Sequence, residues 1–283
     1  MERILVTGAN GQLGTEFSIL SSDYLQYEWI FADRNIITLD DLDLLKVQLR
    51  DIKPTIILNC GAYTAVDKAE SEKDLANIIN NLAVGVLANY STRNEVKLIH
   101  LSTDYVFDGT SSVALDEEAL TNPINAYGET KRLGELACLK ENTNSIIIRT
   151  SWVYSKFGNN FVKTMQRLMQ ERDSISVVND QIGSPTYAVD LARAVIKIIS
   201  FEKWIPGIYN YSNEGEISWY EFALDIKALG GYSCKVEGIP SSAYPTPAKR
   251  PFFSLLDKSK IKQIYAVDVP NYKESLKKML KQL

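Results

Sequence analysis

A glycine-rich turn directly after the first apolar run limits the folds open to this chain more than any other feature. The apolar run is Arg3–Val6, and the turn, Thr7–Gly14, reads TGANGQLG before a helical pattern begins. Gly8 permits a tight turn, Gly11 lets a pyrophosphate approach the backbone, and Gly14 lets the helix pack closely on the strand. The phosphates would lie at the helix N-terminus. We therefore expect a dinucleotide-binding unit, although the spacing is G-x-x-G-x-x-G rather than G-x-G-x-x-G.

Apolar runs and helical patterns alternate after this turn. The expected further strands are Glu28–Ala32, Thr55–Cys60, Lys97–Leu101, Ser145–Thr150 and, as the sixth strand, Ile175–Val178. The expected helices are Asp40–Ile52, Leu75–Thr92, Ala126–Glu141, Asn160–Gln170 and Ala188–Ile199. Strands that alternate with helices predict a parallel sheet with helices on both faces. The fold class we expect is α/β, a Rossmann-type doubly wound parallel sheet.

From about Pro206 the alternation changes, which predicts a smaller C-terminal substrate-binding lobe over the edge of the sheet. A short strand (Gly207–Ser212) and a helix (Trp219–Leu229) precede a segment rich in Pro, Ser and Tyr, and Asn271–Lys281 forms the last helix. The expected dinucleotide-binding domain covers residues 1–152, with about 175–200 also packing on it. Residues 153–174 and 201–283 form the expected smaller lobe.

Composition excludes several functional classes. The 283 residues are 45% hydrophobic and 23% charged with a net charge of −4, so the chain is an ordinary globular protein without a basic surface for nucleic acid. Its three cysteines are scattered singly, which argues against a disulfide framework, and its single histidine, His100, cannot build a zinc cluster. Neither a signal-peptide pattern nor an apolar run of membrane-spanning length is present, so we expect a cytoplasmic protein that binds no membrane.

Tyr127 and Lys131 form the most informative pair for chemistry. They are spaced i and i+4 in an expected helix, so they share one face, one turn apart. A free phenol has a pKa of about 10, and a nearby ammonium group lowers that pKa, which predicts a proton donor for neutral pH. Thr103 follows the fourth strand, at the sheet edge where ligands bind, and its hydroxyl could meet the phenol over one carbonyl oxygen. Such a pair alone also occurs by chance on many solvated helices.

Other strand ends carry further candidate residues. Asp33 closes the second strand, where an acid commonly holds the adenosine ribose, whereas the adjacent Arg34 could accommodate a 2′-phosphate. The choice between NADH and NADPH is therefore open. Small residues after the third strand, Gly61-Ala62-Tyr63-Thr64, would let a cofactor lie against the backbone. Trp152 follows the fifth strand and suits either a sugar pocket or core packing.

Several motifs spread over most of the chain together resemble one known family. They are TGANGQLG (7–14), NCGAYTAVDKAE (59–70), LSTDYVFDG (101–109), PINAYGETKRLGE (123–135), IIRTSWVYS (147–155), GNNFVKTM (158–165), DQIGSPT (180–186) and LDKSKI (256–261). The chain resembles the extended short-chain dehydrogenase/reductase family. Within it, YTAVDKAE and STDYVFDG are typical of a reductase acting on a dTDP-4-keto-sugar, not of the epimerases and dehydratases.

This resemblance implies that a hydride from NADPH or NADH reduces the C4 ketone of dTDP-4-dehydro-β-L-rhamnose to dTDP-L-rhamnose. Tyr127 would donate the proton, Lys131 would lower its pKa and hold the nicotinamide ribose, and Thr103 would bond the carbonyl oxygen. The expected cofactor-binding residues are Gly8, Asn10, Gly11, Gln12, Leu13, Gly14, Asp33, Arg34, Thr38, Leu39, Ala62, Tyr63, Thr64, Tyr127 and Lys131. The expected substrate-binding residues are Thr103, Asp104, Tyr127, Trp152 and Arg250, the last as a diphosphate clamp or a surface charge.

The chain departs from the family pattern at two places. Thr38-Leu39 replaces a frequent Asp-hydrophobic pair near the adenine, which we expect to loosen adenine binding or shift cofactor choice, and Gly61 replaces a usual Ala without harm. Some members carry magnesium at a dimer interface through glutamates. No such ligands are assignable here, so Mg²⁺ and a homodimer stay open.

Two other functions compete with this reductase. One is another nucleotide-sugar reductase or epimerase with the same core. The other is a non-catalytic dinucleotide-binding subunit similar to the regulatory subunit of methionine adenosyltransferase. The complete set of Thr103, Tyr127 and Lys131 favours an enzyme.

Overall fold

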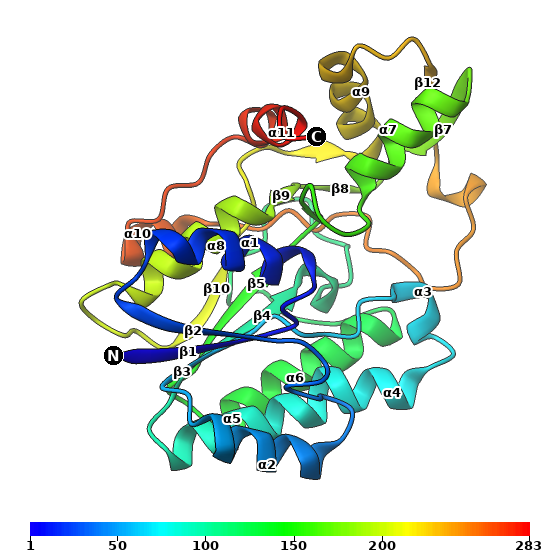
Figure 1. The fold of residues 1–283 in the computed structure, drawn as a ribbon. Helices are drawn as coiled ribbons and strands as arrows, with labels where there is room; N and C mark the ends of the chain where they lie inside the picture. The colour runs from blue at the N-terminus through cyan, green and yellow to red at the C-terminus, as the bar shows by residue number, and fades with distance from the viewer.

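A six-stranded parallel sheet forms the centre of the computed structural model, which describes residues 1–283 (Figure 1). The strand order is β10-β5-β4-β3-β1-β2, and each strand is parallel to its neighbours. The strands are β1 (Glu2–Thr7), β2 (Tyr27–Ala32), β3 (Ile56–Asn59), β4 (Lys97–Thr103), β5 (Ile146–Thr150) and β10 (Gly207–Asn210). The strand order reverses at β1, which pairs with β2 on one side and β3 on the other. Ligands bind at the carboxyl ends of strands beside such a reversal.

Helices cover both faces of the sheet (Figure 1). One face carries α1 (Gln12–Leu20), α8 (Ala188–Ile199) and α10 (Ser259–Tyr265); the other carries α2 (Leu42–Ile52), α5 (Ala83–Arg93) and α6 (Ala126–Glu141). Because side chains alternate along a strand, Ile4 and Val6 join the first core and Leu5 the second. Both faces are therefore apolar, as buried parallel strands require. The expected doubly wound α/β fold is confirmed.

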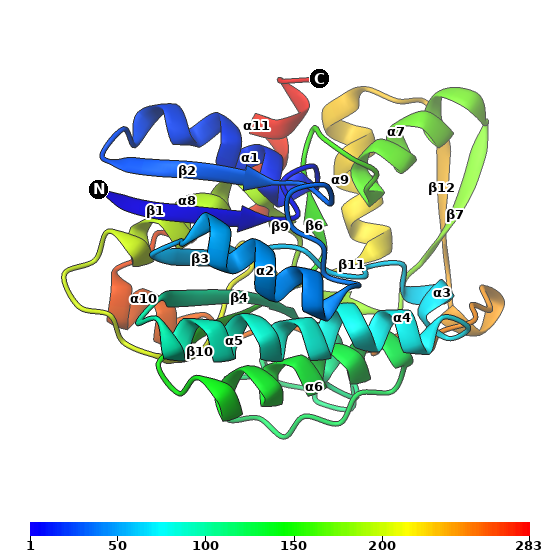
Figure 2. The same cartoon turned by 60° about the horizontal axis from the view of Figure 1, so that its bottom comes forward.

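A second group of elements lies beyond the carboxyl ends of the sheet strands, with most of its members on the right in Figure 2 and α11 at the top. It has a hydrophobic core of its own, to which α7 (Phe161–Glu171), α9 (Trp219–Gly230), α11 (Tyr272–Leu280), β7 (Ser174–Val178) and β12 (Lys235–Ile239) contribute. Short pairs complete it: β6 (Val153–Tyr154) with β9 (Thr186–Tyr187), and β8 (Ile182–Gly183) with β11 (Ile217–Ser218). The proposed boundaries of the two domains stay a prediction.

One strand was assigned wrongly from the sequence. The run Ile175–Val178 does form β7, but β7 pairs with β12 and not with the central sheet. The sixth strand of the sheet is β10, which pairs with β5 through Tyr209 opposite Ile148. An apolar run predicts a strand but not its partner, and here the chain leaves the sheet after β5 and returns only at β10.

The long helix expected over Leu75–Thr92 is built from three parts. They are α4 (Lys73–Asn77), a π-helical segment over Ile78–Leu82, and α5. A π segment inserts an extra residue into the helical ladder and often marks a functional site. Its buried Asn80 bonds the backbone of Tyr63 at both the N–H (2.8 Å) and the carbonyl (3.1 Å), so the segment holds the chain after β3. None of the helices is long and apolar enough to cross a membrane.

Candidate active site

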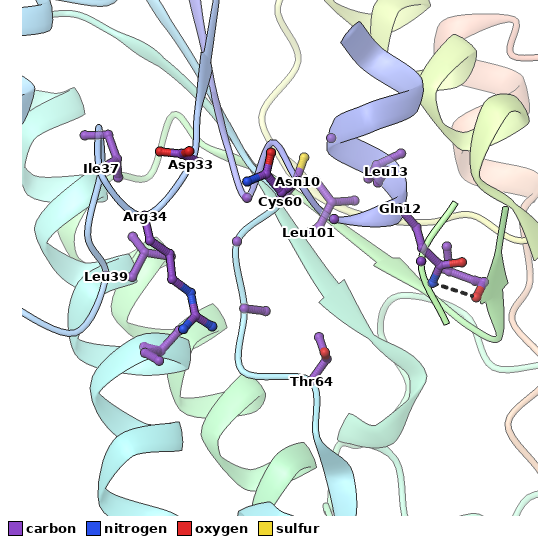
Figure 3. Close-up of a pocket in the computed structure, with 18 of the residues that line it drawn as sticks. Asn10, Gln12, Leu13, Asp33, Arg34, Ile37, Leu39, Cys60, Thr64 and Leu101 are labelled. Carbon is purple, nitrogen blue, oxygen red and sulfur yellow. Dashed lines mark hydrogen bonds between the residues drawn. The ribbon is translucent and has the colours of Figure 1, made fainter. Parts of the chain in front are cut away.

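A cavity of about 650 Å³ lies at the carboxyl ends of the strands around β1 and β3 (Figure 3). Its wall includes the glycine turn, the chain after β2 and β3, and the α6 face that carries Tyr127 and Lys131. Of the residues expected to bind the cofactor, the wall contains Gly8, Asn10, Gly11, Gln12, Leu13, Gly14, Asp33, Arg34, Leu39, Ala62, Thr64, Tyr127 and Lys131. Residues far apart in the sequence thus meet in one groove.

The backbone of the glycine turn leaves no room for a side chain at Gly8 and Gly14. Gly8 has a φ of +65°, and a Cβ atom there would lie 2.8 Å from the backbone of Gly61. A Cβ atom on Gly14 would lie 2.4 Å from the carbonyl oxygen of Gly8. Gly11 precedes α1 and offers no side-chain cap, so the first N–H groups of α1 remain available to an anion. The turn therefore suits a pyrophosphate, as its sequence predicts.

The residues after β2 form the far end of the cavity. Asp33 accepts a hydrogen bond from the backbone N–H of Asn35 at 2.9 Å, whereas Arg34 makes no ion pair and lies in the cavity wall (Figure 3). Thr38 is absent from the wall: its hydroxyl bonds Asp40, and its N–H donates to Gln48 at 3.0 Å. The structure thus brings Leu39 but not Thr38 to the cavity.

Tyr127 lies in the first turn of α6, partly buried in the cavity wall beside the end of β4. Burial raises the pKa of its phenol to about 12, while hydrogen bonding with Thr103 acts in the opposite direction. Thr103 is buried at the end of β4, where its hydroxyl also donates to Asp104 Oδ1 at 3.1 Å. Tyr127 and Thr103 therefore lie close together, and their meeting over one carbonyl oxygen stays a prediction.

Lys131 is bonded to the backbone of β4 and lies beside His100. Its Nζ donates to the carbonyl oxygen of Leu101 at 2.6 Å and lies 3.4 Å from His100 Nε2. The Tyr127 pKa is shifted here by burial, Thr103 and Asp104, and lowering of that pKa by Lys131 stays a prediction. Burial also lowers the pKa of Lys131 itself to about 8, against the charge of Glu135.

The start of α6 is held by residues that sequence reasoning missed. Asn125 caps the helix by accepting from Gly128 N at 2.8 Å, and its Nδ2 donates to the carbonyl oxygen of Lys249 at 2.7 Å. Glu70 accepts a second hydrogen bond, from the N–H of Ala126, at 2.8 Å. An Asn directly before a helix is a recognisable N-cap signal. The bonds to Glu70 and Lys249 have no such local signal.

Arg250 is engaged by a partner that the sequence did not suggest. Its two terminal nitrogens bond both oxygens of Asp67, at 2.9 and 2.8 Å, and the Arg250 side chain also bonds the carbonyl of Ala248. Asp67 lies in α3 (Val66–Ala69), inside the YTAVDKAE motif. The pair connects this motif to the segment that passes the start of α6. Arg250 therefore has a carboxylate partner, and its role as a diphosphate clamp stays a prediction.

Like Thr103 and Arg250, the predicted residues Asp104, Trp152 and Tyr63 lie outside the cavity wall. Asp104 is buried, its Oδ2 has no hydrogen-bond partner, and burial raises its carboxyl pKa to about 6. Trp152 stacks on Trp219 with ring centroids 3.6 Å apart and adopts a φ of +48°. Tyr63 points its hydroxyl to Glu72 at 2.6 Å. A buried, incompletely bonded carboxylate next to the Tyr127 phenol is typical of a ligand-binding site.

A buried ion pair between Glu135 and Arg149 connects α6 to the central sheet. Glu135 accepts hydrogen bonds from Arg149 at 2.9 and 2.8 Å and from Ser102 at 2.6 Å, with Glu135 and Arg149 both almost fully buried. This network joins α6 to β4 and β5 behind Lys131. No three acidic, histidine or cysteine side chains come together as a metal site, and magnesium ligands stay unassigned.

The whole chain is similar to one known protein family and to several of its members. Residues 1–283 match the family described as RmlD substrate binding domain. A dTDP-4-dehydrorhamnose reductase from Aggregatibacter actinomycetemcomitans is 40% identical over 287 residues, covering 98% of each chain. The crystal structure of a dTDP-4-dehydrorhamnose reductase from Clostridium acetobutylicum ATCC 824 is 38% identical, with a TM-score of 0.94 and 99% of each chain covered. That of the Bacillus anthracis str. Ames enzyme, in complex with NADP, is 37% identical, with a TM-score of 0.95 over 100% of this chain and 99% of that one.

Proposed function

This chain belongs to the dTDP-4-dehydrorhamnose reductase family, and from that membership we propose that it reduces the C4 ketone of dTDP-4-dehydro-β-L-rhamnose to dTDP-L-rhamnose. The observation that carries this proposal is the meeting of Tyr127, Lys131 and the glycine turn in one cavity, with Thr103 beside the phenol. A regulatory subunit that only bound dinucleotide would need no such arrangement.

The cofactor would occupy the cavity along the glycine turn. The pyrophosphate is best placed at Gly11, Gln12 and Leu13, where the first N–H groups of α1 are available. A nicotinamide cofactor held along this turn would supply the hydride for the C4 carbon. Because Arg34 is cationic and without an acidic partner, it suits a 2′-phosphate, and we propose NADPH as the better of the two cofactors. The NADP complex of the Bacillus anthracis relative supports this assignment.

The residues of the chain would supply and direct the proton. Since the phenol pKa lies near 12, Tyr127 stays protonated at neutral pH and can donate to the O4 oxygen as the hydride arrives at C4. Thr103 would hold that oxygen beside the phenol. Lys131, fixed to the Leu101 carbonyl, presents its remaining N–H groups toward the cavity that would hold the ribose. Such general acid help contributes roughly 10²- to 10⁴-fold in rate.

The substrate would lie between the sheet and the smaller lobe. Asp104, which acts on the Tyr127 phenol, is proposed to bind the dTDP-sugar together with Trp152 and Arg250. Arg250 already has a carboxylate partner in Asp67, so a diphosphate would share the guanidinium with it. The three cysteines are all free, which suits a reducing compartment, and we propose a cytoplasmic enzyme.

A coupled assay with dTDP-4-dehydrorhamnose tests the function, run in parallel with NADPH and NADH. We expect cofactor oxidation with this sugar, and none with UDP-sugars that an epimerase would accept. Tyr127→Phe should lose most of its turnover, roughly 10²- to 10⁴-fold, while its affinity for the cofactor stays unchanged. Unchanged turnover would exclude Tyr127 as the acid. A stoichiometric synthetase partner together with absent reductase activity would instead favour the regulatory alternative.

A further inference from the structure

The only histidine of the chain lies in a buried chain of hydrogen bonds that ends at Lys131. His100 is fully buried on β4, with Nδ1 2.9 Å from Asn59 Nδ2 and Nε2 3.4 Å from Lys131 Nζ. Asn59 Oδ1 accepts from the hydroxyl of Thr7 at 2.7 Å, and that hydroxyl accepts from the N–H of Gly61 at 3.0 Å. The chain therefore connects the lysine to the backbone of the cofactor cavity, which Gly61 lines.

The direction of these hydrogen bonds conflicts with a charged lysine. If the Thr7 hydroxyl donates to Asn59 Oδ1, then Asn59 Nδ2 donates to His100 Nδ1, and a neutral imidazole must carry its hydrogen on Nε2. That hydrogen then points at Lys131 Nζ, and an ammonium group there has only donors. Two donors cannot share one bond. The arrangement is consistent only with a neutral amine.

A reversed arrangement satisfies the ammonium form. The Asn59 amide turns by half a rotation so that Oδ1 accepts from Nδ1–H of His100, while its NH₂ group donates to the Thr7 oxygen. His100 Nε2 then accepts from the Lys131 ammonium group. The amide orientation is an assignment from the hydrogen-bond network, so both arrangements fit the same heavy-atom positions. The imidazole is neutral in both, because burial and the nearby lysine hold the pKa of His100 well below its usual value.

We propose that His100 is a positioning residue whose tautomer follows the charge of Lys131. It carries its hydrogen on Nδ1 while Lys131 is an ammonium group and on Nε2 once Lys131 is neutral. In either form the imidazole holds the amine against the Leu101 carbonyl and keeps it aimed at the cavity. The catalytic role of Lys131 rests on the proposed function. The change of His100 tautomer with the charge of Lys131 does not depend on that function.

Two thiols and a carboxylate face Lys131 near this pair. Cys60, at the end of β3, and Cys138, on α6, face Lys131, and burial raises their thiol pKa values to about 12 and about 11, so both stay neutral near pH 8. Glu135 faces Lys131 from the next turn of α6, but its carboxylate is bonded to Arg149. Lys131 is therefore the group whose charge changes beside His100.

A single histidine makes the test direct. In full-length protein labelled with ¹⁵N-histidine, the two imidazole nitrogen shifts report the tautomer of His100 alone. We expect the Nδ1–H form at about pH 6 and the Nε2–H form at about pH 10, changing over as Lys131 loses its proton. Lys131→Met should show the Nε2–H form throughout. One unchanged tautomer across this range in the wild-type protein would overturn the proposal, whether or not the variant folds.

Kinetics separate positioning from mere structural support. His100→Gln keeps an acceptor that can approach Lys131, whereas His100→Leu removes it. We expect turnover to fall about tenfold or more in the leucine variant, with partial rescue by glutamine and a displaced pH profile. Equal loss in both variants with an unchanged pH profile would assign His100 a structural role only. If the His100 tautomer changes with pH but the protein has no reductase activity, the proposed function is refuted and the inference about His100 still holds.

Discussion

Asn125 makes two hydrogen bonds whose loss can be measured separately. In Asn125→Ala, the N-cap of α6 is lost, at about 0.5–2 kcal/mol, together with the bond to the Lys249 carbonyl, at about 0.5–1.5 kcal/mol. The free energy of unfolding should therefore fall by about 1–3.5 kcal/mol. At about 2.1 cal/mol/K per residue, unfolding 283 residues carries an entropy of about 0.6 kcal/mol/K, so Tm should drop by about 2–6 °C.

Turnover should fall as well, because Tyr127 lies two residues after the cap and depends on the position of the first helical turn. Asn125→Asp is the matched control. Its carboxylate keeps the cap and suits the helix N-terminus, but it removes the donor to Lys249. We expect this variant to keep more of its Tm than the alanine variant and still to lose turnover.

Thermal unfolding by circular dichroism and the coupled reductase assay check both quantities on the same preparations. A Tm and a turnover equal to those of the wild type in Asn125→Ala would refute the reasoning. Equal Tm losses in the alanine and aspartate variants would show that the cap contributes nothing and that only the bond to Lys249 matters.

Three further predictions follow from charged side chains. Glu135→Gln leaves the Arg149 charge buried and unpaired, and should cost about 3–5 kcal/mol in denaturant unfolding, whereas Arg167→Gln, which breaks an exposed pair, should cost less than about 1 kcal/mol. Arg34→Ala should raise the KM for NADPH roughly tenfold, which corresponds to a loss of about 1.4 kcal/mol of binding free energy, and should leave the KM for NADH unchanged. Equal effects on both KM values would contradict a contact between Arg34 and the 2′-phosphate. Asp104 has a pKa of about 6 in the folded chain, above the usual value, so the folded state binds more protons than the unfolded state between about pH 4 and 6. Stability should therefore fall as pH rises through that window, by at most about 3 kcal/mol, and Asp104→Asn should abolish this decline in pH-dependent unfolding.

Local patterns account for the parts of the fold and site that the sequence predicted well. The glycine turn, the alternation of apolar runs with helical patterns, and the spacing of Tyr127 and Lys131 act over a few residues, where backbone geometry sets the outcome. A side chain at Gly8 or Gly14 would collide with nearby backbone, so the need for glycine at these positions can be recognised from the turn motif alone. The family resemblance drew on the same short motifs.

Partners and burial were decided by the tertiary structure. The sequence could not show that Asp67 pairs with Arg250, 183 residues later, or that β10 and not β7 completes the sheet. The pKa of Tyr127 moves upward because the fold buries the phenol. The hydrogen bonds of Lys131 to Leu101 and His100 likewise exist only in the folded chain. The spacing of residues along a helix predicts which side chains share a face. Only the packed chain determines their solvent exposure and hydrogen-bond partners, and these two quantities set the energies of ionisable groups.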